Sequence, residues 1–66
     1  QKAAIAEVRQ MAEAKLAEQE ILFKSGLART FDPAERAALE DGYRRDVARL
    51  HEERDRKVEK IRHEER

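Results

Sequence analysis

The stretch Ser25-Gly26-Leu27-Ala28-Arg29-Thr30-Phe31-Asp32-Pro33 holds the only cluster of helix-breaking residues in the sequence, and it separates two helical patterns. Gly26 favours the left-handed conformation that ends many helices. Leu27 would then pack on Leu22, as the apolar contact of a Schellman motif requires. We therefore expect the first helix to end at about residue 25 and a loop to occupy residues 26–32, the alternative being a disordered linker.

A second helix is expected directly after this loop. Asp32 is a good N-cap, and Pro33 suits the first helical position because its missing N–H has no partner to lose there. Glu35 completes a D-x-x-E pattern similar to a capping box. The predicted helix covers residues 33–65, and its large apolar residues form one narrow stripe: Leu39, Tyr43, Val47, Leu50, Val58 and Ile61.

Gly42 is the one weak point of this second helix, because a glycine inside a helix costs about 1 kcal/mol relative to alanine. The sequence Asp41-Gly42 could instead end a short helix, which would give three helices in all. The apolar stripe keeps the same phase on both sides of Gly42, so we favour one continuous helix.

Upstream of the loop, residues 2–25 also follow a helical period. The large apolar residues of this segment fall within one arc: Ile5, Val8, Met11, Leu16, Leu22 and Phe23. Two helices joined by a short loop normally fold back antiparallel. The sequence thus predicts an all-α fold, an antiparallel two-helix hairpin similar to a coiled coil, with the second helix longer than the first.

Pairing residues about the middle of the loop gives an expected register, in which Leu16 faces Tyr43 and Val8 faces Leu50. Met11 would face Val47 in the same register. The expected hairpin core combines the first stripe with apolar residues around the turn: Ile5, Val8, Met11, Leu16, Leu22, Phe23, Leu27, Phe31 and Leu39.

In this register the second helix extends past the first beyond about Lys57. Val58 and Ile61 would then be covered by residues upstream of this segment, by a second copy or by a binding partner, or they would stay exposed at a frayed end. Arg54 lies inside the same stripe, where a charged residue commonly specifies register or partner. Because two helices bury little apolar surface, we expect dimerisation into a helical bundle or a helical partner protein to complete the core. The expected partner-binding residues are Tyr43, Val47, Leu50, Arg54, Val58 and Ile61.

Length, charge and composition limit what else the chain can be. Its 66 residues make one small domain, and we read them as an excerpt of a longer protein because they begin with Gln1. Fifteen basic and fifteen acidic residues leave no net charge, which argues against nucleic acid and anionic membranes as main partners. The sequence has no cysteine and no apolar run of membrane-spanning length, which is typical of an intracellular protein of cytoplasm or nucleus.

The chain offers little for catalysis or for binding a cofactor. Its only imidazoles, His51 and His63, lie on the second helix among acidic side chains whose directions rotate, so three or four metal ligands do not converge. There is no nucleophile beside a base and no glycine-rich phosphate loop. We therefore expect a non-enzymatic chain without cofactor or metal.

The most favoured function is a protein–protein interaction or oligomerisation module that acts as a scaffold or as a subunit of a larger complex. Two alternatives remain open at this point. The arginines of the second helix could bind nucleic acid, or the hairpin could act as an effector that binds a switch protein such as a small GTPase.

Overall fold

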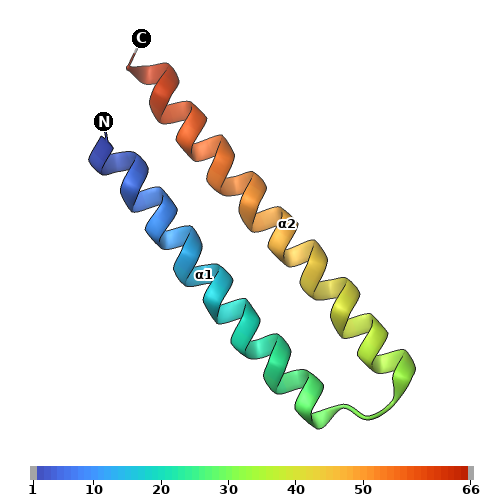
Figure 1. Cartoon of the computed structure of the whole chain (residues 1–66). Coiled ribbons are helices and arrows are strands. Elements are labelled where there is room, and N and C mark those ends of the chain that lie inside the picture. The colour runs from blue at the N-terminus through green and yellow to red at the C-terminus, as the bar shows by residue number, and fades with distance from the viewer. Residues whose placement is uncertain (1, 66) are drawn as a thin grey trace.

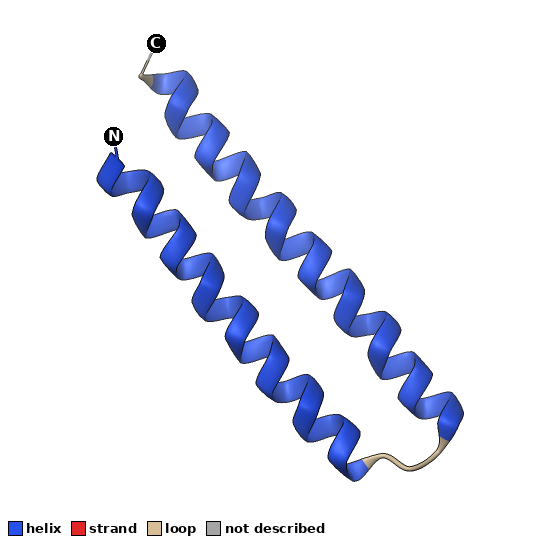
Figure 2. Ribbon diagram, viewed as in Figure 1, coloured by secondary structure: helices blue, strands red, loops and turns tan. Residues whose placement is uncertain are grey.

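The computed structural model describes residues 2–65, and two helices account for nearly all of them. Helix α1 spans Lys2–Arg29 and helix α2 spans Pro33–Glu64, with no strand over the described range. The helices run antiparallel and side by side, so that the first and last turns lie at the same end (Figures 1 and 2). The predicted all-α hairpin is confirmed, although α2 exceeds α1 by only four residues, 32 against 28.

The prediction that Gly26 ends the first helix is wrong. Helix α1 continues through Gly26 to Arg29, and no glycine of the described chain has a positive φ. Gly26 lies against Leu39 of α2, where a Cβ would stand 3.6 Å from the Leu39 Cδ1 atom. Continuing the helix keeps one more turn of backbone hydrogen bonds and brings Leu27 into a half-buried position. The loop therefore shortens to residues 30–32.

The end of α1 is held by a side chain from the other helix. The last carbonyl groups of a helix lack partners within it and need donors from elsewhere. The Nη1 group of Arg36 donates hydrogen bonds to the carbonyl oxygens of Leu27 and Thr30, both at 2.8 Å. The backbone N–H of Thr30 also donates to the Leu27 carbonyl, at 3.3 Å. Arg36 thus joins the start of α2 to the end of α1.

The start of α2 follows the prediction. Asp32 is the N-cap, its Oδ2 atom accepts a hydrogen bond from the backbone N–H of Glu35 at 3.0 Å, and Pro33 begins the helix. Helix α2 then passes through Gly42 without interruption. The three-helix alternative is therefore wrong, because the helical hydrogen bonds and the continuous apolar stripe outweigh the cost of one glycine.

The register of the hairpin differs from the expected one by seven residues of α1, which is about two turns of helix. Tyr43 faces Phe23 instead of Leu16, with ring centroids 4.3 Å apart. The physical reason is the shorter loop, which moves the point of reversal toward the C-terminus by lengthening α1. As a result, the last third of α2 runs beside the beginning of α1 instead of extending past it (Figure 1).

The centre of the hairpin is narrow. Ala12, Leu50 and Val58 are the only described residues that are almost fully buried, each less than a tenth exposed. Around them lie the half-buried members of the expected core: Ile5, Val8, Leu16, Phe23, Leu27 and Leu39. The core prediction is wrong for three other residues: Met11 is 61% exposed, Leu22 58% and Phe31 85%.

Candidate functional site

Most of the expected partner-binding residues are covered by the chain itself. Leu50 and Val58 are buried against α1, which corrects the prediction that Val58 lies uncovered beyond its end. Tyr43 stacks on Phe23 and is half-buried, and Val47 and Ile61 are also half-buried. These side chains hold the hairpin closed, so a partner would reach Leu50 and Val58 only by opening it.

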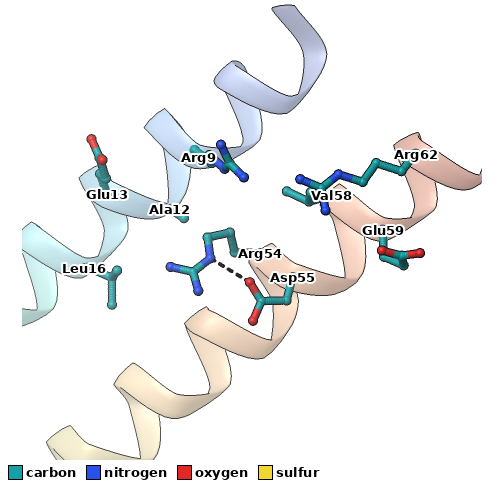
Figure 3. Close-up of a pocket in the computed structure, with 9 residues that line it drawn as sticks. All are labelled: Arg9, Ala12, Glu13, Leu16, Arg54, Asp55, Val58, Glu59 and Arg62. Carbon is teal, nitrogen blue, oxygen red and sulfur yellow. Dashed lines mark hydrogen bonds and ion pairs between the residues drawn. The ribbon is translucent and has the colours of Figure 1, made fainter. Parts of the chain in front are cut away.

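Arg54 lies between the two helices, close to Ala12 and Leu16 of α1 (Figure 3). Its Nε atom donates a hydrogen bond to the Oδ1 atom of Asp55 at 2.9 Å. This hydrogen bond, and then the charge of the same guanidinium, lowers the pKa of the Asp55 carboxyl below its usual value. The side chain of Arg54 remains 31% exposed, so its charge keeps contact with water while its stem packs in the groove.

The hollow around Arg54 carries both signs of charge in equal number. Three basic and three acidic side chains line it together with Ala12, Leu16 and Val58 (Figure 3): Arg9, Arg54, Arg62, Glu13, Asp55 and Glu59. Such a balanced lining selects neither an anion nor a cation. Over residues 2–65, no group of three His, Cys, Asp or Glu side chains is placed to hold a metal ion.

A different surface carries the exposed apolar side chains of α1. Met11 and Leu22 are eleven residues apart, which is about three turns, so both point to the same side of the helix. Lys15 and Glu18 lie between them within the same arc, and both are exposed. We call the surface formed by Met11, Lys15, Glu18 and Leu22 the Met11–Leu22 face.

Each end of the Met11–Leu22 face borders a hollow between the helices. Met11 lines one hollow together with Val8 and Leu50. Leu22 lines another, and its other walls come from both helices: Gln19, Phe23, Ala38, Leu39, Gly42, Tyr43 and Asp46. Both hollows open on the same side of the hairpin, and apolar side chains form much of their walls.

Sequence reasoning assigned Met11 and Leu22 to the core because they fall inside the apolar arc of the first helix. That arc is wider than one neighbouring helix can cover, and the two residues lie at its edge. Their position at the edge is the signal that could have identified them as exposed. Ile21, also 68% exposed, was not among the expected site residues and points away from this face, being turned by about 100° from Leu22.

No protein-family model, no curated protein and no solved structure matches the chain. A function must therefore be argued from the surface of the hairpin. Neither helix, over the described residues, is long and apolar enough to cross a membrane.

Proposed function

We propose that the chain is a non-catalytic protein–protein interaction module, a helical hairpin that associates through its Met11–Leu22 face. The observation that carries this proposal is the exposure of two large apolar side chains on one side of α1, each beside an apolar hollow. A single exposed apolar residue needs no explanation, but two on one side of a helix, each beside an open hollow, make this side the best candidate for a contact surface.

The thin core of the hairpin supports the same proposal. Among residues 2–65 only Ala12, Leu50 and Val58 are almost fully buried, so the isolated hairpin has few well-packed side chains to offset its conformational entropy. Fully burying a Met or Leu side chain contributes ~1.5–3 kcal/mol, and Met11 and Leu22 have more than half of this still to gain. Covering the face with another helical surface would supply this missing stabilisation.

Ion pairs weigh against nucleic-acid binding by the arginines of α2. Arg45 pairs with Asp41 at 2.7 Å, and Arg49 pairs with Asp46 at 3.2 Å. Phosphate groups would have to compete with these carboxylates, and acidic side chains alternate with the arginines along the helix.

The proposal is tested by photo-crosslinking in the cell that makes the protein. A photoreactive phenylalanine analogue replaces Met11 in one variant and Ala48, an exposed residue of α2, in the control. We expect adducts with another polypeptide chain, identical or different, from position 11 and none from position 48. Equal yields from the two positions, or no adduct from position 11, would contradict the proposal.

A further inference from the structure

We propose that a second copy of this chain covers the Met11–Leu22 face, with the two α1 helices packed antiparallel about a two-fold axis. This inference rests on the proposed function and names the partner. The axis runs between the two α1 helices, perpendicular to both, at the level midway between Met11 and Leu22. Met11 of each copy then lies opposite Leu22 of the other, so the interface repeats the same apolar contact twice, as two-fold symmetry requires.

The charges on the face fit this arrangement. Lys15 and Glu18 are equally distant from the proposed axis, so Lys15 of one copy lies opposite Glu18 of the other. Within residues 2–65 neither Lys15 nor Glu18 forms an ion pair, although other charged side chains, such as Lys24 with Glu20, do. Two Lys15–Glu18 pairs would form across the axis. A parallel arrangement would instead place like charges opposite each other, which is unfavourable.

The hollow beside Leu22 has space for Met11 of the second copy. Gly42 lines this hollow, and a Cβ built on Gly42 would meet no atom within 4 Å. Within the described part of the chain nothing requires a glycine at position 42, since its φ is not positive and its surroundings are open. The missing side chain at Gly42 would leave room for Met11 of the second copy. Methionine is long and flexible and adapts well to irregular spaces.

The size and net charge of the hairpin also suit a dimer. The hairpin extends 52 by 15 Å between Cα atoms, which gives a second hairpin room to lie along it. The formal net charge is zero, so two copies do not repel each other as a whole.

The test is sedimentation equilibrium on the 66-residue chain and its charge-reversal variants. We expect the wild-type chain to dimerise. Lys15→Glu or Glu18→Lys alone turns two attractive pairs into two repulsive ones and should raise the dimer Kd about tenfold. Lys15→Glu combined with Glu18→Lys exchanges the charges across the axis and should restore the wild-type Kd to within about threefold.

A matched pair of variants tests the apolar contact. Met11→Glu places a carboxylate in the hollow of the second copy and should raise the Kd about a hundredfold or more. Ile21→Glu changes an equally exposed apolar residue of the same helix that lies off the face, and its Kd should stay within about twofold of the wild-type value. Circular dichroism checks that all variants remain helical.

The outcomes separate this inference from the proposed function. A wild-type chain that stays monomeric at every concentration overturns the inference, while adducts with a different protein from position 11 would leave the proposed function intact. A wild-type dimer that is insensitive to Met11→Glu, or whose double charge reversal fails to restore the Kd, also overturns it. An absence of any adduct from position 11 overturns the proposed function itself.

Discussion

The rings of Phe23 and Tyr43 stack face to face across the hairpin, with centroids 4.3 Å apart and planes inclined by 8°. This contact joins the last third of α1 to the first third of α2. It is the only ring–ring contact of the described chain. It fits the register in which Val58 of α2 lies beside Ala12 of α1.

Removing one ring should therefore destabilise the hairpin measurably. We expect Tyr43→Ala to lower the free energy of unfolding by ~2 kcal/mol, less than for a fully buried aromatic residue because Tyr43 is half-buried. Tyr43→Phe keeps the stacked ring and should change it by less than ~0.5 kcal/mol. Urea unfolding followed by circular dichroism measures both, and equal losses for the two variants would contradict a role of the ring contact.

Arg36 should matter more than the other arginines of α2. Arg36→Gln removes the charged donor to the Leu27 and Thr30 carbonyl oxygens and should cost ~1–2 kcal/mol of unfolding free energy. The control is Arg44→Gln, because Arg44 makes only an exposed ion pair with Asp41 at 3.7 Å, worth less than ~0.5 kcal/mol. Chemical denaturation compares the two variants, and similar costs would show that Arg36 does not hold the turn.

The sequence was sufficient to predict two helices, the N-cap at Asp32 and the antiparallel hairpin, because local signals decide these features. It was insufficient for the end of α1. A glycine in a loop-like context signals a helix end, but tertiary contacts decide whether the helix continues, and here Leu27 and Arg36 favour one more turn. Since loop length sets the register, this one error displaced the predicted register, so that Tyr43 meets Phe23 in place of Leu16.

The same error affected the candidate site. Val58 was expected to be uncovered, whereas the observed register buries it beside Ala12. Met11 and Leu22 were expected to be core, and both are more than half exposed. Periodicity identifies which residues share a side of a helix. How much of that apolar side a single neighbouring helix covers depends on how the two helices pack, which cannot be read from the sequence alone.

The two glycines should respond differently to alanine. In each case the φ is not positive and a Cβ has space, so Gly26→Ala and Gly42→Ala should both stabilise the helix by ~0.5–1 kcal/mol. Only Gly42→Ala narrows the hollow beside Leu22, and only this variant should weaken the proposed dimer. Unfolding at low concentration measures the first effect and sedimentation the second. A dimer equally stable in both variants would contradict the assignment of this hollow.

The Asp55 carboxyl should titrate below the usual pKa of an aspartate, about 3.9. Because its pKa is lowered in the folded chain, mainly by the hydrogen bond from Arg54, its stabilising contribution is present above that usual value and is lost as the pH falls through the lowered one. Carbon NMR should show the pKa rising toward the usual value in Arg54→Gln. It should not change in Arg56→Gln, and an unchanged pKa in Arg54→Gln would contradict this account.

The central claim is that this hairpin completes its core by association with a second copy of itself through the Met11–Leu22 face. Thermal unfolding of the chain, followed by circular dichroism over a hundredfold range of concentration, tests it most directly. A dimer should show a Tm that rises by about 10 °C across this range, whereas Met11→Glu should melt at one lower temperature throughout. A wild-type Tm that is independent of concentration and equal to that of Met11→Glu would contradict the claim.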